Sequence, residues 1–141
     1  MKWVVDASVA AKWLAPELES PQAAALLNDK LVAPDLLFAE VGNILWKKQS
    51  RGELDTATAQ LGARWLLQVP LHVHESSGLL ADALELALQL QHPAYDCFYL
   101  ALAERVDAPL VTADKRLHGR CMLADPGRWR DRVRMLGAVL S

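Results

Sequence analysis

Short apolar runs alternate with longer amphipathic stretches along the whole chain. Five runs are apolar and short enough for strands, at residues 3–5, 31–33, 71–73, 110–112 and 133–136. Between them, apolar side chains recur every three or four residues, which predicts helices at 8–14, 22–28, 36–48, 55–68, 79–90 and 94–106 and a short helix after position 114. Strands that alternate with helices in this way predict one α/β domain with a mostly parallel sheet.

The local pattern also predicts where single elements lie. Every side chain of the run 3–5 is apolar, as in a strand buried on both faces, whereas the run 71–73 alternates in a way that suits a sheet edge. Ser8 stands where the first helix would take its N-cap. Leu80, Ala83, Leu84 and Ala87 are expected on one side of their helix.

Two aspartates closely follow predicted strands. Asp6 comes directly after the run 3–5, and Asp114 comes two residues after the run 110–112. Because the carboxyl ends of parallel strands meet at one edge, where ligands bind in open α/β sheets, we expect both carboxylates at that edge. Each aspartate taken alone could also serve only as the N-cap of the helix that follows it.

Two further acids lie on predicted helices that can reach the same edge. Glu40 stands among the apolar residues of its helix, and an unpaired carboxylate is costly to bury. Glu40 therefore needs a cation, a hydrogen-bond network or a metal, unless it reaches water or pairs with Lys47 or Lys48. Asp96 lies in the first turn of its helix, where it also interacts favourably with the helix dipole.

Taken together, these four carboxylates predict a metal site. Crowded into one crevice, they would repel each other and hold protons unless cations neutralised them. Oxygen ligands in this number suit Mg²⁺ or Mn²⁺, and the chemistry that follows is metal-assisted hydrolysis of phosphodiesters. The hydroxyls of Ser8 and Thr112 could orient water or a phosphate there, or serve only as local caps.

Charge is distributed unevenly along the chain. The formal net charge is −2, but residues 115–134 hold seven basic residues and two acids, whereas residues 1–114 hold eight basic residues and fifteen acids. A basic tail on an acidic body is typical of a phosphate-binding face, and Lys115, Arg116 and Arg120 are its candidate nucleic-acid contacts. A surface that is merely solvated is the alternative.

The remaining composition excludes several classes of protein. Cys97 and Cys121 are too few and too far apart for a zinc or redox motif, so we expect reduced thiols. The sequence has no basic leader and no apolar stretch long enough to cross a bilayer, so we expect a cytoplasmic protein without a membrane partner. Five tryptophans are many for this length, and we expect Trp46 and Trp65 at a protein interface, although core burial is commoner for tryptophan.

Four stretches of the sequence resemble one known family. They are VVDASV, APDLLFAEVGNIL, AYDCFYLALAE and LVTADKRL, and each contains one of the four acids. Their order and surroundings are similar to those of the PIN-domain ribonucleases, and closely similar to the VapC-type toxins of toxin–antitoxin pairs. The resemblance covers essentially the whole chain and implies a single PIN-like domain over residues 1–141. It implies a three-layer α/β fold with helices flanking a mostly parallel sheet of four to five strands.

The resemblance also carries expectations about function. Every acid of the family pattern is present, its strand-end hydroxyl falls on Thr112, and its small polar residue after the first acid falls on Ser8. It implies Mg²⁺- or Mn²⁺-dependent endoribonuclease activity on structured or translational RNA. It further implies a homodimer, and a cognate VapB-type antitoxin whose C-terminal segment blocks the groove.

Two other interpretations of the same residues stay open. A phosphoacceptor receiver domain also gathers acids and a metal at the carboxyl ends of parallel strands, but it would have adjacent acids after its first strand, where Asp6 stands alone. A PIN-like module that binds metal and nucleic acid without cutting is the second. Labelling by a small phosphodonor would indicate the first, and RNA that stays intact with Mg²⁺ or Mn²⁺ would indicate the second.

Overall fold

The computed structural model describes residues 1–15 and 17–139. Its strands are β1 (Lys2–Val5), β2 (Lys30–Pro34), β3 (Leu71–His74), β4 (Leu110–Thr112) and β5 (Val133–Met135). Its α-helices are α1 (Ala7–Leu14), α2 (Ser20–Ala25), α3 (Leu36–Ser50), α4 (Thr56–Leu66), α5 (Leu80–Leu90), α6 (Ala94–Val106), α7 (Lys115–Ala124), α8 (Pro126–Trp129) and α9 (Leu136–Val139). Two 3₁₀ helices, η1 (Leu26–Asn28) and η2 (Ser76–Leu79), precede β2 and α5.

The strands form one sheet in the order β3-β2-β1-β4-β5, and every neighbouring pair is parallel. At its centre, Trp3 of β1 is opposite Leu31 of β2, and Val5 of β1 is opposite Val111 of β4. The run 3–5 is buried throughout, whereas β3 at the edge has no fully buried residue. These observations confirm the predicted parallel sheet and its edge strand.

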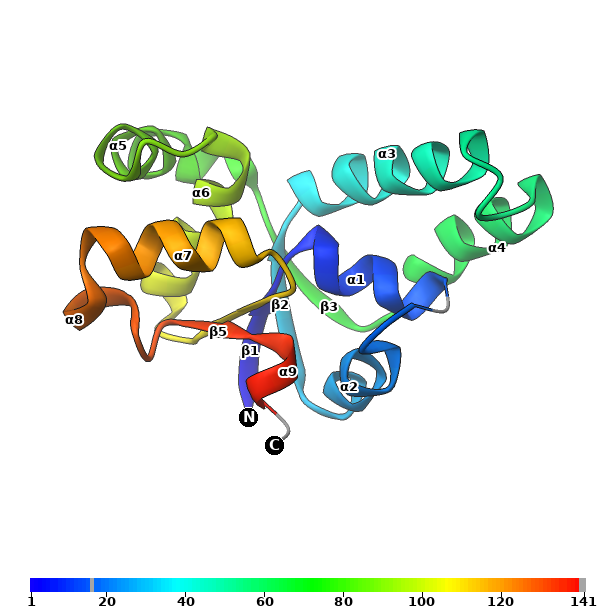
Figure 1. Cartoon of the computed structure of the whole chain (residues 1–141), viewed down its shortest axis with the longest axis horizontal. Coiled ribbons are helices and arrows are strands. Elements are labelled where there is room, and N and C mark those ends of the chain that lie inside the picture. The colour runs from blue at the N-terminus through cyan, green and yellow to red at the C-terminus, as the bar shows by residue number, and fades with distance from the viewer. Residues whose placement is uncertain (16, 140–141) are drawn as a thin grey trace.

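Helices lie on both sides of the sheet, α1 to α4 on one side and α5 to α8 on the other (Figure 1). Aliphatic side chains of the central strands meet those of α1, α3 and α6 in one core, in which Trp129 and Tyr99 are the largest fully buried side chains. The arrangement confirms the expected α/β fold. Within the described ranges, no helix is long and apolar enough to cross a membrane.

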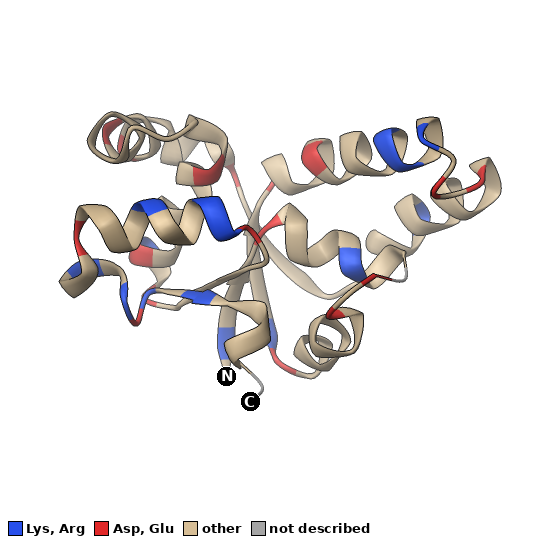
Figure 2. Cartoon of the chain, viewed as in Figure 1, with Lys and Arg blue, Asp and Glu red and all other residues tan. Residues whose placement is uncertain are grey.

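The chain direction brings four helix ends to one edge of the sheet. Because the strands are parallel, α1, α3 and α7 each begin close after a strand ends, at the carboxyl edge. Helix α6 runs back toward the start of β4, so its first turn lies at the same edge. Figure 2 shows acidic positions where these helix ends converge.

The start of the first helix confirms the capping role considered for Asp6 and not the cap expected at Ser8. Asp6, and not Ser8, is the N-cap of α1, and its carboxylate accepts a hydrogen bond from the backbone N–H of Val9. Both residue types cap helices well, and Asp6 is the single residue between the end of β1 and the start of α1. Ser8 lies in the first turn and donates its hydroxyl proton to Asp6 instead.

The predicted side of α5 is only partly buried. Ala83 is buried, together with Leu86 and Leu90. Leu80, Leu84 and Leu88 are 57%, 52% and 65% exposed and form a stripe along the outer surface of the helix. The sequence of α5 is apolar on two sides, so its periodicity fits either orientation, and packing against α6 selects one.

Candidate active site

Asp6 is buried at the end of β1 with both carboxylate oxygens engaged. Oδ1 accepts hydrogen bonds from the Ser8 hydroxyl at 2.6 Å and from the N–H of Val9 at 3.2 Å. Oδ2 accepts one from the hydroxyl of Thr112 at 2.5 Å. The side chain is therefore fixed by neutral donors, and only 4% of the residue is exposed.

The two hydroxyls that hold Asp6 also join the ends of β1 and β4. The Thr112 oxygen accepts a hydrogen bond from the backbone N–H of Asp114 at 3.0 Å, and the Ser8 oxygen accepts one from the N–H of Ala113 at 3.0 Å. Thr112 has no exposed surface and Ser8 is half-buried. Their hydroxyl protons orient the Asp6 carboxylate.

Asp114 is the N-cap of α7, which confirms that structural role. Its Oδ1 accepts hydrogen bonds from the N–H groups of Arg116 at 2.9 Å and Leu117 at 3.3 Å. Its Oδ2 makes no hydrogen bond within residues 1–15 and 17–139. One oxygen is thus left for a ligand while the other holds the helix.

Glu40 reaches the same region from the second turn of α3. It is half-buried, and its Oε1 accepts a hydrogen bond from the phenol of Tyr99 on α6 at 2.6 Å. It pairs with neither nearby lysine, because Lys48 forms an ion pair with Glu17 at 3.2 Å and Lys47 has no acidic partner among the described residues. A hydrogen bond to a buried tyrosine, not a cation, therefore holds Glu40.

Asp96 lies in the first turn of α6 beside a buried histidine. The Nε2 atom of His92 is 2.5 Å from Oδ2 of Asp96. One ligand atom each of His92, Asp96 and Asp114 lie within 4.8 Å of one another, close enough to surround a single ion. His92 lies in the turn before α6, Asp96 lies in the first turn of α6, and Asp114 lies at the start of α7.

Burial and mutual repulsion raise the pKa of three of these acids. Loss of hydration raises the pKa of Asp6 to about 6, against the lowering effect of its hydrogen-bond donors. Burial also raises the pKa of Glu40 and that of Asp96 above their usual range. Repulsion by Asp96 adds to the rise at Asp6 and at Glu40, and repulsion by Asp114 adds to the rise at Asp96. Asp96 thus interacts electrostatically with each of the other three acids.

The acid cluster, defined as Asp6, Glu40, Asp96 and Asp114, has little basic charge beside it: His92 contacts Asp96, and Arg116 lies close enough to act electrostatically on the same carboxylate. Among the described residues, no lysine or arginine forms an ion pair with any of its members. The donor set is mostly carboxylate oxygen, which suits a hard divalent cation of the Mg²⁺ or Mn²⁺ type. The residues present therefore fit such an ion.

The basic tail divides into paired and unpaired side chains. Arg128 and Arg132 form ion pairs with acids of α6 and the turn after it, at 2.6 and 2.9 Å. The side chains of Lys115, Arg116 and Arg120 make no hydrogen bond or ion pair in the part of the chain that the structure describes, and they lie on α7, which Asp114 begins. Figure 2 shows basic positions along this helix.

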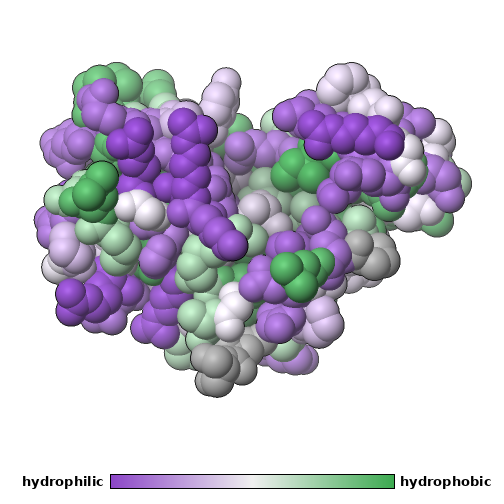
Figure 3. Space-filling view, in the orientation of Figure 1, coloured by the Kyte–Doolittle hydropathy of each residue, from purple (hydrophilic) through white to green (hydrophobic). Residues whose placement is uncertain are grey.

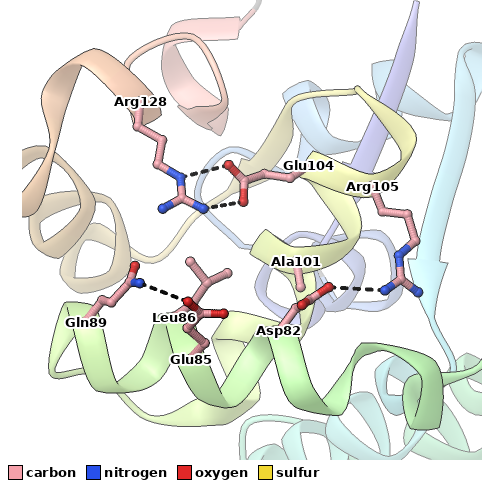
Figure 4. A pocket seen from close by; sticks show the side chains of 8 residues that line it. All are labelled: Asp82, Glu85, Leu86, Gln89, Ala101, Glu104, Arg105 and Arg128. Atoms are coloured by element: carbon pink, nitrogen blue, oxygen red, sulfur yellow. Dashed lines mark hydrogen bonds and ion pairs between the residues drawn. The ribbon is translucent and has the colours of Figure 1, made fainter.

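A separate hollow of about 380 Å³ lies between α5, α6 and α8 (Figure 4). Four of its five charged side chains are paired, Arg128 with Glu104 and Arg105 with Asp82, and the fifth, Glu85, accepts a hydrogen bond from Gln89. None of the four acids lines it. This hollow is therefore not part of the candidate active site.

Comparison with known proteins decides the family, because residues 3–120 match the PIN domain. The chain belongs to the PIN domain family. Ribonuclease VapC3 of Pyrobaculum aerophilum is 40% identical to this PIN domain over 121 residues, which cover 83% of this chain and 92% of that protein. Identity at this level over this length places the chain with the VapC proteins. The receiver-domain interpretation is therefore wrong.

Solved structures share the fold of this PIN domain. The crystal structure of PAE2754 from Pyrobaculum aerophilum has a TM-score of 0.74 and is 24% identical, and the match covers 99% of this chain and 87% of that one. A toxin–antitoxin complex from Klebsiella pneumoniae has a TM-score of 0.63 and is 14% identical, with coverage of 94% and 96%. These likenesses confirm the expected PIN-like fold.

Two residues of the site in this PIN domain were not predicted from the sequence. His92 stands four residues before Asp96, and the two side chains are in contact although His92 lies in the turn between α5 and α6, just before Pro93, the N-cap of α6. Tyr99 stands three residues after Asp96, on the same side of α6. The spacing of His92 and Asp96 could have predicted their contact. The partner of Tyr99, Glu40, lies 59 positions away in the sequence, so no local pattern could have predicted that hydrogen bond.

Proposed function

We propose that this PIN domain is a divalent-metal-dependent endoribonuclease that acts as the toxin of a VapBC-like pair. The observation that carries the proposal is the acid cluster, in which four carboxylates that form no ion pair with lysine or arginine among the described residues gather at the carboxyl edge of the sheet. The relative VapC3 of Pyrobaculum aerophilum is a ribonuclease by name, which supports RNA as the substrate class. We propose structured or translational RNA as the target.

Mg²⁺ or Mn²⁺ is the proposed cofactor. The acid cluster would hold it, and a bound ion would supply an activated water and neutralise charge on the phosphate. The chain's own residues fix the carboxylates beforehand, through Thr112 and Ser8 at Asp6, His92 at Asp96, and Tyr99 at Glu40, as the hydrogen bonds above indicate. Because Thr112 has no exposed surface, we assign its positioning role to the Asp6 carboxylate and not to water or phosphate.

Cleavage of purified RNA tests this function. We expect wild-type protein to cut structured RNA with Mg²⁺ or Mn²⁺ and to leave it intact with a chelator. Asp96→Asn keeps the size of the side chain and removes its charge, so it should lose most of the cleavage. RNA that stays intact with wild type and variant alike would favour the non-cutting module. Sequencing RNA 5′ ends after brief induction would then locate the target.

We propose a VapB-type antitoxin as the protein partner. A hollow of about 290 Å³ between α1 and α4 is lined largely by apolar side chains, including Trp13, Leu61 and Trp65. Leu61 is 62% exposed and Trp65 is 42% exposed, which leaves an apolar groove open to solvent. A C-terminal segment of the antitoxin would fill it. The fold shared with the Klebsiella pneumoniae toxin–antitoxin complex supports this partner.

Two tryptophan variants test the antitoxin surface. Trp65→Ala should weaken antitoxin binding because it removes one wall of the groove. Trp46→Ala removes a side chain that is 63% exposed on α3, and it tests whether the interface extends there. If both variants retain antitoxin affinity and oligomeric mass, neither tryptophan belongs to an interface.

We propose a homodimer formed through the outer stripe of α5. Three exposed leucines, Leu80, Leu84 and Leu88, follow one another at intervals of one helical turn, and such a stripe is stabilised when a second copy covers it. Leu84→Glu should convert the dimer to a monomer in light scattering. Leu123→Glu is the matched control on α7, where the leucine is 79% exposed. An unchanged mass for Leu84→Glu would contradict this interface.

We also propose that the protein acts in the cytoplasm and that residues 1–141 form one domain. The family match ends at residue 120, but β5, which follows it, pairs with β4 from inside the matched region. Buried Val133 and Leu136 contribute to the same core. The segment beyond the match is thereby joined to the PIN domain.

A further inference from the structure

A groove of about 370 Å³ runs between α1 and α3, and one end of it reaches the neighbours of Asp6 and Asp114. Ser8 and Ala113 line the groove, and they are joined by the hydrogen bond beside Asp6. Ala11 and Ile44 also line it and give it an apolar part. The rest of its lining is charged, with four basic residues, Lys12, Lys47, Lys48 and Arg51, and two acids, Glu17 and Glu53.

Two of these four cations are free to bind a ligand. The Nζ atom of Lys12 donates to the backbone oxygen of Leu18 at 2.8 Å, and Lys48 forms its ion pair with Glu17. Among the described residues, the side chains of Lys47 and Arg51 have neither a hydrogen bond nor an ion pair, and both residues are exposed. We call Lys47 and Arg51 the α3 row.

The α3 row continues the helix face that brings Glu40 to the acid cluster. Glu40, Ile44, Lys47 and Arg51 follow one another at intervals of four, three and four residues, so they share one side of α3. At 1.5 Å per residue, the two cations lie about 10 and 16 Å from Glu40 along the helix axis. Figure 2 shows basic positions at this far end of α3.

A second row of free cations lies across the molecule on α7. Lys115, Arg116 and Arg120 form this α7 row, which begins directly after Asp114 of the acid cluster. In Figure 3, hydrophilic surface gathers over α7 and over α3, on the two sides of a hollowed central region. The acid cluster therefore lies between two rows of unpaired cations.

We propose that the groove between α1 and α3 binds RNA backbone phosphates on one side of the scissile bond, while the α7 row binds them on the other side. The inference rests on the proposed ribonuclease function. An acidic pocket repels a polyanion, so cations on both flanks are needed to hold a strand across it. The apolar part of the groove beside these cations gives a ribose or base a surface to contact, which favours a single strand.

The salt dependence of RNA binding tests the two-sided path. The Asp96→Asn protein is used so that RNA is not cut, with a fluorescein-labelled single-stranded RNA of random sequence that is long enough to span both rows. Each phosphate contact with a single strand contributes about 0.7 to the slope of log affinity against log salt. In that background, Lys47→Gln with Arg51→Gln should therefore lower the slope by about 1.4, and Arg116→Gln with Arg120→Gln should lower it by a similar amount.

A matched control separates local contacts from general charge loss. Lys30→Gln with Arg64→Gln removes two exposed cations from β2 and α4, outside both rows, and should leave the slope nearly unchanged. If the α3-row variant behaves like this control while the α7-row variant loses affinity, RNA bypasses the groove and the inference is wrong. If the protein binds no RNA even at low salt, the proposed function fails with it.

Chemical protection gives a second result without changing the α3 row. Acetylation of Lys47, measured by mass spectrometry, should slow when RNA is bound, because a phosphate would cover its ammonium group. Lys30 should react at the same rate with and without RNA. Equal reactivity of Lys47 in both states would overturn the inference.

Discussion

The phenol of Tyr99 on α6 donates a hydrogen bond to Oε1 of Glu40 on α3 at 2.6 Å. It joins helices from the two sides of the sheet at the point where the acid cluster forms. Tyr99 is 1% exposed, so its hydroxyl is fixed by the core. The position of Glu40 thus depends on a residue that is not itself an acid.

Tyr99→Phe should separate this positioning effect from packing. The ring remains, but the Glu40 carboxylate loses its donor, so we expect the free energy of unfolding to fall by about 1–2 kcal/mol at neutral pH. The pKa of Glu40 should rise further, because the hydrogen bond from Tyr99 lowers it in the wild type. Urea denaturation measures the first effect and NMR titration the second. Tyr95→Phe, on an exposed tyrosine of the same helix, should change neither.

Asp6→Asn should stabilise the metal-free protein at neutral pH. The pKa of Asp6 is raised from 3.8 to about 6, so the folded state holds this proton more tightly than the unfolded chain does. The stability that Asp6 contributes is complete below pH 3.8, falls as the pH rises to about 6 and stays low above it. The total loss is on the order of 3 kcal/mol.

Urea denaturation in the presence of a chelator measures this difference. The stability gain of Asp6→Asn over wild type should grow between pH 4 and about pH 6 and then level off. Added Mg²⁺ should shrink the gain, because the ion neutralises the wild-type carboxylate. A variant that is less stable than wild type by the same amount at every pH would contradict the assignment.

Thr112→Val should be more harmful than Thr112→Ser. Valine has the shape of threonine but lacks the hydroxyl, so the Asp6 carboxylate loses a donor and the N–H of Asp114 loses its acceptor. We expect a loss of about 2–3 kcal/mol in unfolding free energy. Serine keeps the hydroxyl and loses one methyl group, at a cost of about 1 kcal/mol. If valine is tolerated better than serine, packing outweighs the hydrogen bonds.

His92→Leu should weaken metal binding more than His92→Gln does. The imidazole lies against Oδ2 of Asp96, and groups that hold a ligating carboxylate typically contribute about 10–100-fold to metal affinity. Glutamine places an amide N–H near the position of Nε2 and should retain most of that affinity. Electron paramagnetic resonance of free Mn²⁺ gives the affinity directly. Equal Mn²⁺ affinity in wild type and His92→Leu would show that His92 has no positioning role.

The sequence was most informative where a short apolar run is followed closely by an acid. Apolar runs followed by an acid predicted β1 with Asp6 and β4 with Asp114, because strand ends and helix starts have local signals. The parallel order of the sheet then follows from the alternation of strands and helices. Parallel strands also place Asp6 and Asp114 at the same edge of the sheet, and this can be predicted without knowledge of any tertiary contact.

The features that the sequence did not predict depend on contacts between segments, which the sequence of one segment does not determine. The contact between Glu40 and Tyr99 depends on how α3 and α6 are placed, and lysine pairing was an equally reasonable local solution for Glu40. The predicted side of α5 is only partly buried, because alanine and leucine also occupy a second side, and packing against α6 decides which leucines are covered. Asp6 took the cap expected of Ser8, since both side chains can accept the same hydrogen bond.

Crystals grown with Mn²⁺ and measured for anomalous scattering test the central claim most directly. An ion held by the acid cluster should give a peak between the carboxylates of Asp96 and Asp114, close to Asp6. The peak should disappear in the Asp96→Asn protein. No peak at the acid cluster in wild type at saturating Mn²⁺, or a peak unaffected by Asp96→Asn, would contradict a metal-dependent active site there.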